Sequence, residues 1–126
     1  MRVEREHNTM FNFEKLEAWK KSVDFADLVY ETTKQFPKEE RFGLTNQMRR
    51  ASVSVSSNLA EGSSRSSKTD YSRFVELSSG SLFEVVSQAF IASRQKYLTQ
   101  PEFKKIYAAA EELSRMLSGL KTYLAQ

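Results

Sequence analysis

Four amphipathic segments, separated by three short breaks, constrain this sequence of 126 residues more than any other feature. In each segment the apolar residues recur at steps of three and four, the spacing that places them on one face of an α-helix. The chain has only four Gly and two Pro, which argues against a loop-rich or all-β fold. The segments predict helices at residues 13–36, 44–62, 68–97 and 100–125.

The apolar stripe of each expected helix should face a shared core. Short connections make sequential helices antiparallel neighbours. We therefore expect an all-α fold, an antiparallel up-down-up-down four-helix bundle spanning residues 13–126. The predicted core residues are, helix by helix, Leu16, Trp19, Val23, Ala26, Tyr30 and Thr33; Leu44, Met48, Ala51, Val55 and Leu59; Tyr71, Phe74, Ser78, Leu82, Val85, Ala89 and Ala92; and Phe103, Ile106, Ala110, Leu113, Leu117, Leu120 and Leu124.

Local signals support the predicted boundaries. Thr99 followed by Glu102 fits a capping box, in which the two side chains bond to free backbone amides at the start of a helix. Gly62 is expected to end the second helix. Residues 1–12 carry charges of both signs and no apolar stretch. They are expected to form a flexible N-terminal extension and not a secretory signal.

The segment from Ala51 to Ser56 contains a competing signal. Its apolar and polar residues alternate, which is the pattern of a half-buried strand. Serine and valine are also mediocre helix formers. A lone strand would have no partner in this chain, however, and the flanking residues keep the helical period. Helix is therefore the favoured prediction for this segment.

The composition excludes several kinds of site. The chain has no Cys, so disulfides, thiolate metal sites and Cys nucleophiles are impossible. The single histidine, His7, lies in the expected extension, and no Gly-rich phosphate loop is present. We expect no enzyme, no metal site and no cofactor. No apolar run approaches the roughly 20 residues that cross a bilayer, so no membrane association is expected and the expected location is cytoplasmic.

The third predicted helix has a second apolar line. Phe83, Phe90 and Tyr97 recur at steps of seven, away from the core stripe, while Leu77 lies on another side and Gly80 on the far side. One interpretation is that a wide core or the loops cover these rings. The other is an oligomer contact, because exposed aromatic patches are seldom left open to water. We favour the second interpretation and predict a homo-oligomer.

The second predicted helix has a polar line beside its apolar stripe. It could be an ordinary solvated face, or a partly buried hydrogen-bonded ridge in which Arg50 is held by Glu61 of a neighbouring subunit or of another helix. Both interpretations stay open. The line, called the polar ridge below, consists of Gln47, Arg50, Ser54, Asn58 and Glu61.

The net charge of +3 is concentrated near this helix. From Leu44 to Lys68 the only acid is Glu61, and this segment accounts for a charge of +3. Such a surface could meet phosphates of RNA or DNA, with serine hydroxyls adding hydrogen bonds. The alternative function is a protein–protein assembly or adaptor module that binds no nucleic acid. The predicted nucleic-acid-binding residues are Arg49, Arg50, Arg65 and Lys68.

Three motifs in this sequence resemble a known family. The longest is the run Phe36-Pro37-x-x-Glu40-x-Phe42-Gly43-Leu44-x-x-Gln47-x-Arg49-Arg50-Ala51-x-x-Ser54-Val55-x-x-Asn58-x-Ala60-Glu61-Gly62. The others are Gly80-Ser81-Leu82-x-Glu84 and Phe13-x-x-Leu16-x-x-Trp19. Together they resemble the bacterial four-helix bundle proteins encoded by intervening sequences in 23S rRNA genes, over nearly the whole chain after Met10.

The resemblance implies a fold and an assembly. Members of the family are four-helix bundles, and related bundles assemble as ring-shaped homopentamers. The accessory variability proteins of diversity-generating retroelements are similar in fold and partner a reverse transcriptase and nucleic acid. The biochemical role of the intervening-sequence members is not established. Carried onto this sequence, the motif marks Arg49, Arg50, Asn58 and Glu61 as functional positions.

Overall fold

The computed structural model describes residues 10–126 of the chain, and in that range it contains helices and no strand. Four α-helices follow one another, α1 (Glu17–Thr33), α2 (Leu44–Ser63), α3 (Lys68–Arg94) and α4 (Gln100–Leu124). Two short 3-10 helices, η2 (Asn12–Lys15) and η3 (Lys38–Glu40), precede α1 and α2. The all-α prediction is confirmed. Of the predicted extension, residues 1–9, which include His7, lie outside the described residues.

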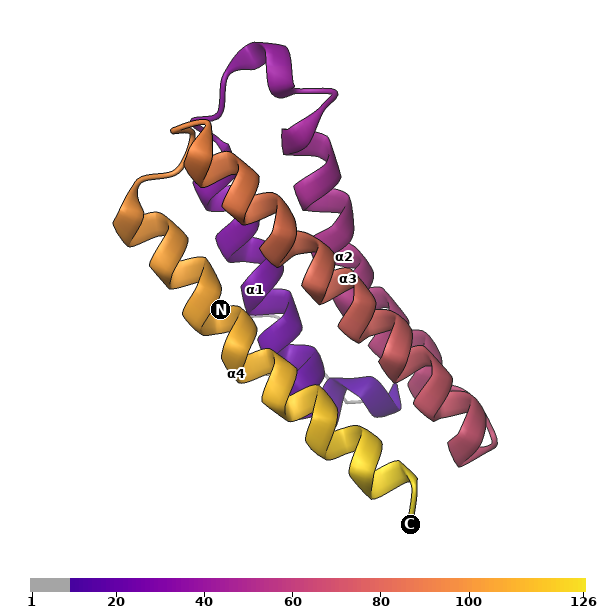
Figure 1. Ribbon diagram of the computed structural model, residues 1–126. Helices are drawn as coiled ribbons and strands as arrows, with labels where there is room; N and C mark the ends of the chain where they lie inside the picture. The colour runs from indigo at the N-terminus through magenta and orange to yellow at the C-terminus, as the bar shows by residue number, and fades with distance from the viewer. Residues whose placement is uncertain (1–9) are drawn as a thin grey trace, which may run out of the picture.

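Consecutive helices pack against each other, and α1 also packs against α4, which closes the bundle. Figure 1 shows the connections at alternating ends of the bundle, with α2 and α3 side by side over most of their length. The segment from Ala51 to Ser56, with its alternating pattern, lies inside α2 and is helical. Burial of one face of α2 outweighs the mediocre helix propensity of its serines and valines.

The core was predicted well for α2 and α4. In α2 the side chains of Met48, Val55 and Leu59 are fully buried, as are Ile106 and Leu113 in α4. These helices bury large aliphatic residues at steps of three and four, so their sequence period identifies the inner face directly. In α3 the predicted stripe is also buried from Phe74 onward, with Tyr71 half-buried.

The predicted stripe of α1 was correct only in part. Thr33 is buried as predicted, and Leu16 and Trp19 pack against the core, but Tyr30 is exposed. The other buried residues of α1 are Ala18, Ser22, Phe25, Val29 and Thr32. The buried hydroxyls donate to carbonyls of their own helix, Ser22 to Trp19 at 2.6 Å and Thr33 to Val29 at 2.7 Å. Burying a hydroxyl costs little free energy when it is hydrogen-bonded. Small polar residues can therefore occupy the inner face of α1, where the sequence period suggested larger apolar residues.

Gly62 has a different role from the predicted one. It does not end α2 but lies buried in the last turn, and the helix ends after Ser63. A Cβ atom at position 62 would lie 2.7 Å from Cβ of Phe74 and 3.0 Å from Cδ1 of Tyr71. The lack of a side chain therefore allows α2 and α3 to approach closely at their hairpin.

The ends of α3 and α4 are fixed by side chains and by backbone geometry. The predicted capping box of α4 is confirmed: the amide of Thr99 donates to Glu102 Oε1 at 2.8 Å, and the amide of Glu102 donates to Thr99 Oγ1. These bonds, first of all the one from the backbone of Thr99, lower the pKa of Glu102. Helix α3 ends at Arg94, three residues before the predicted end, because Lys96 adopts a left-handed φ of 65°.

Candidate functional site

Arg49, the first predicted nucleic-acid-binding residue, contacts α1. Its Nε donates to the Thr33 hydroxyl at 2.9 Å, and its Nη2 donates to the Tyr30 carbonyl at 3.4 Å. The guanidinium carbon also lies 4.7 Å from the centre of the Tyr30 ring. These contacts place a positive charge on the last turn of α1, where the unpaired carbonyls of a helix favour a cation. Arg49 therefore joins α2 to the end of α1.

Arg65 and Lys68 lie at the opposite end of α2. Arg65 donates to Glu61 at 2.8 Å, its Nε is 3.7 Å from Asp70, and its guanidinium lies over the Phe74 ring. Lys68 is 3.4 Å from the carbonyl oxygen of Gln126. At a helical rise of about 1.5 Å per residue, Arg65 is roughly 20 Å from Arg50 along the chain. The four predicted cations therefore form two separate groups.

Arg50 is the least constrained of the four. It is exposed on α2 and has no hydrogen bond or ion pair to any of the residues that the structure describes. The other three side chains contact α1, neighbouring acids or the C-terminus. Arg50 is thus the predicted residue whose charge is most available to a ligand.

The polar ridge is only partly brought together. Asn58 donates through Nδ2 to the Ser54 carbonyl and to the Ser54 hydroxyl, at 2.9 and 3.0 Å. Ser81 of α3 donates to the same hydroxyl at 2.9 Å, so these three residues form a half-buried cluster between α2 and α3. The remaining ridge residues, Gln47, Arg50 and Glu61, are exposed.

The predicted aromatic line is divided into two parts. Phe83 is 65% exposed, and Phe90 is 49% exposed although its ring contacts Phe103 and Tyr107 of α4 edge-on. Tyr97 does not continue this line, because it follows the end of α3, where its ring packs 5.5 Å from that of Phe36. Because α3 ends at Arg94, Tyr97 does not follow the helical spacing that places Phe83 and Phe90 on the same line.

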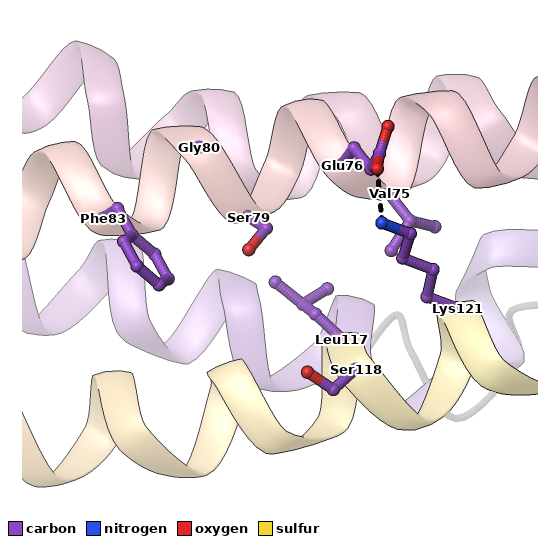
Figure 2. A pocket seen from close by; sticks show the side chains of 8 residues that line it. All are labelled: Val75, Glu76, Ser79, Gly80, Phe83, Leu117, Ser118 and Lys121. Carbon is purple, nitrogen blue, oxygen red and sulfur yellow. Dashed lines mark hydrogen bonds and ion pairs between the residues drawn. The ribbon is translucent and has the colours of Figure 1, made fainter.

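An open groove follows the seam between α3 and α4, with Phe83 along its length. One part, of about 390 Å³, is lined by the small residues Ser79, Gly80 and Ser118 together with the aliphatic Val75 and Leu117 (Figure 2). Lys121 pairs with Glu76 beside it. The other part, of about 460 Å³, includes Phe90 and is mostly apolar. No atom outside the helix backbone lies within 4 Å of a Cβ at position 80. The exposed ring of Phe83 therefore lies next to a recess in the surface at Gly80.

Glu40 joins three segments at the end of the bundle where α1 and α3 finish. The hydroxyl of Tyr97 donates to Glu40 Oε2 at 3.1 Å, which raises the pKa of Tyr97, while Glu40 Oε1 accepts from the amide of Leu44 at 2.9 Å. Glu40 thereby connects η3, α2 and the α3–α4 loop. The same end carries a second group of exposed cations, which the sequence analysis missed: Lys34, Lys38, Arg41, Arg94, Lys96, Lys104 and Lys105.

The acids of this end are fewer, and most of them have partners. Glu31 pairs with Lys34, and Glu102 accepts from Thr99 and Gln35. Glu39 is exposed and, like six of the seven cations, has no ion pair to the described residues. Residues 31–43 and 94–105 carry a formal charge of +3, as large as that of the whole chain. These segments are distant in sequence, so counting charge along the chain could not reveal the group.

The described part of the chain places two chemical limits on a site. No group of three His, Asp or Glu residues within it is arranged to hold a metal ion. None of its helices combines the length and the apolar character needed to span a membrane. What residues 10–126 offer a ligand is charge, hydroxyl groups and aromatic surface.

The fold defines the class: this is a small all-α protein of four packed helices. Residues 14–119 match the family described as 23S rRNA-intervening sequence protein, and the chain belongs to this family. A crystal structure of a protein of unknown function, from the S23 ribosomal protein family of Bacteroides thetaiotaomicron, has the same fold. Its TM-score is 0.74 at 19% identity, over 82% of this chain and 97% of that one. No curated protein matches the chain.

Proposed function

We propose that this protein is a non-enzymatic, self-associating helical module whose function is to bind other macromolecules. The observation that carries the proposal is the pair of exposed rings, Phe83 and Phe90, on the α3–α4 seam. Exposed aromatic side chains grouped beside a groove are typical of interaction sites on proteins that are otherwise polar outside.

The shape of the seam favours a second copy of the chain as the occupant. Phe83 protrudes one helical turn from Gly80, where the surface is recessed and lined in part by small residues. The ring of one subunit can therefore fill the recess of the next. A head-to-tail contact of this kind generates a closed ring when the rotation between subunits allows it. The pentamer implied by the family resemblance would satisfy that condition.

Light scattering coupled to size-exclusion chromatography at micromolar concentration tests self-association. The wild-type protein should elute as an oligomer, and Phe83→Glu should elute as a monomer with unchanged helical circular dichroism. Leu77→Glu is the matched control, because Leu77 is also exposed on α3 but lies outside the seam groove. A monomeric wild type would disprove the proposal. An oligomer that Leu77→Glu disrupts and Phe83→Glu leaves intact would show that another face is used.

Nucleic acid is the second part of the proposal, and exposed cations support it. Arg50 and six of the seven cations at the end with η3 are exposed and have no carboxylate partner among the described residues. They can therefore contact phosphate without first breaking an ion pair. In an oligomer each weak patch is repeated and can act together with the others.

Binding of labelled RNA and DNA at several salt concentrations tests this part. Affinity should fall steeply as salt increases, because each phosphate contact releases counterions. The variant with Gln at positions 49, 50, 65 and 68 should bind more weakly. No binding of RNA or DNA at low salt, together with a specific protein captured by the immobilised oligomer, would instead support the adaptor function.

A further inference from the structure

We infer that the end of the bundle formed by η3 and the α3–α4 loop binds single-stranded nucleic acid, with Phe42 stacking on a base and the surrounding cations on phosphates. The inference rests on the nucleic-acid association proposed above and assigns it to a surface that contains none of the four cations predicted from the sequence.

Phe42 is the most exposed aromatic residue that the structure describes, at 84%. It lies between η3 and α2, and the guanidinium carbon of the adjacent Arg41 is 5.4 Å from the centre of its ring. A ring this exposed contributes little to the core. An unpaired base can stack on such a ring or on an arginine plane, which makes aromatic and arginine pairs a recurring feature of single-strand binding sites.

Glu40 fixes the position of this pair. Its carboxylate accepts one hydrogen bond from the Leu44 amide at the start of α2 and another from Tyr97. Arg41 and Phe42 follow it directly, so they are presented by a loop that is fastened on both sides. The same Tyr97 contact brings the loop that contains Lys96 to the end of the bundle where η3 lies. A preorganised loop loses less entropy when a ligand binds.

Lys96 provides an independent observation. It is the one non-glycine residue with positive φ in the described chain, at 65°. The backbone closes the end of α3 here, where the Tyr97 amide donates to the Ala92 carbonyl at 2.9 Å and glycine is the usual residue at the left-handed position. Residues held in such sparsely populated backbone conformations cluster at functional sites. The structure thus keeps a lysine, at a conformational cost, where a positive charge joins the other unpaired cations.

The choice of a single strand over a duplex follows from the aromatic ring. Base faces in a duplex are covered by their neighbours, so Phe42 could reach one only by disrupting the stack. A polyanion without bases, such as polyglutamate, would contact the cations but would have nothing to stack on Phe42. Preference for a single-stranded oligonucleotide over both is therefore the distinguishing property.

Fluorescence anisotropy with the full chain and a labelled single-stranded 12-mer of RNA tests the inference. Substituting Lys38, Arg41 and Lys96 by Gln should weaken binding at least tenfold at low salt and reduce the slope of log affinity against log salt by about 2, at roughly 0.7 per lost phosphate contact on a single strand. Lys15, Lys20 and Arg115, similarly substituted, form the control, because they are exposed cations away from this end.

Two variants isolate the ring. Phe42→Ala should weaken single-strand binding roughly tenfold with an unchanged salt slope. Phe42→Trp keeps an aromatic ring and should bind as tightly as wild type. The fluorescence of the new tryptophan should be quenched when the RNA is added. Phe11→Ala is the aromatic control, since Phe11 is 57% exposed and precedes α1, at the opposite end of that helix from η3.

The possible failures can be told apart. If wild-type protein binds no oligonucleotide at low salt, both this inference and the proposed nucleic-acid function are wrong. If the variant at positions 49, 50, 65 and 68 loses binding while the variants at positions 38, 41, 42 and 96 keep it, the proposed function stands and this assignment is wrong. Equal affinity for polyglutamate or for duplex would also overturn it.

Discussion

Gly62 of α2 lies so close to Phe74 of α3 that a methyl group at position 62 would be 2.7 Å from Phe74 Cβ. Two backbones therefore meet at the hairpin with no room for a side chain. The neighbouring atoms include Phe74 Cβ and the Tyr71 backbone carbonyl as well as a Tyr71 ring carbon, so moving the ring alone gives no relief and the helices must move apart.

Gly62→Ala should lower the free energy of unfolding by about 1–3 kcal/mol, because overpacking outweighs the gain in helix propensity. Gly119→Ala should raise it by about 0.5–1 kcal/mol, since Gly119 lies in α4 with no atom near its Cβ direction. Urea denaturation of both variants provides the comparison. Equal effects would contradict the close approach.

Gly80→Ala separates folding from assembly. Within one subunit nothing lies within 4 Å of a Cβ at position 80, so this substitution should stabilise the fold as Gly119→Ala does. If the recess receives Phe83 of a neighbouring subunit, the same methyl group should weaken self-association. Sedimentation over a range of concentrations measures this. Unweakened assembly would place the contact elsewhere on the molecule.

Arg49 and Arg50 should behave differently although they are adjacent. Arg49→Gln removes a charged hydrogen bond to Thr33 and the contact with the Tyr30 ring, so unfolding should become easier by about 1–2 kcal/mol. Arg50→Gln should leave stability within about 0.5 kcal/mol and weaken nucleic-acid binding. Thermal unfolding and anisotropy on the same samples distinguish them. The reverse pattern would show that Arg49 is the residue available to ligands.

Lys96→Gly should stabilise the protein while impairing its binding. Glycine reaches φ of 65° without the Cβ clash, which is worth about 1 kcal/mol in the free energy of unfolding. The lost charge should reduce affinity for single-stranded RNA. Lys96→Asn is a useful comparison, since asparagine tolerates this conformation and is also uncharged. A glycine variant that binds as well as wild type would leave the strain without a functional reason.

Glu102 predicts a dependence on pH. Its pKa is lowered in the folded state by the hydrogen bond from the Thr99 backbone. The stabilisation it contributes is therefore present above its ordinary pKa of 4.5 and is lost as the pH falls through the lower folded value. Wild type should exceed Glu102→Gln in stability at pH 7, and the difference should shrink on acidification to about pH 3. A difference that is constant with pH would contradict the shift.

The sequence predicted the helices whose buried faces are large and aliphatic. In α4, Leu113 and Leu117 are buried as their period requires. In α1 the period failed because hydroxyl residues such as Ser22 occupy the inner face and bond within their own helix, whereas the larger Tyr30 is exposed and contacts Arg49. A hydrophobicity pattern cannot distinguish a hydroxyl that is satisfied internally from one that faces water.

The candidate surfaces were predictable only where they lie within one helix. The exposure of Phe83 follows from its position on α3, and the sequence located it correctly away from the core stripe. The arrangement near η3 depends on the contact between Tyr97 and Glu40, which are 57 residues apart. Charges counted along the chain likewise could not show that Arg49 is engaged by α1 while Arg50 is not.

The hydroxyl of Ser78 in α3 donates to the Val55 carbonyl of α2 at 2.7 Å, within the buried core. The buried hydroxyls of α1 donate only to carbonyls of their own helix, although the Thr33 hydroxyl also accepts from Arg49 of α2. A hydrogen bond inside the core therefore fixes how far α2 and α3 are shifted along each other. The position of α1 along the bundle is instead fixed by contacts nearer the surface, such as Arg49 with Thr33 and Lys21 with Glu112. We therefore expect the loss of those outer contacts to affect the packing of α1 before it affects the α2–α3 pair.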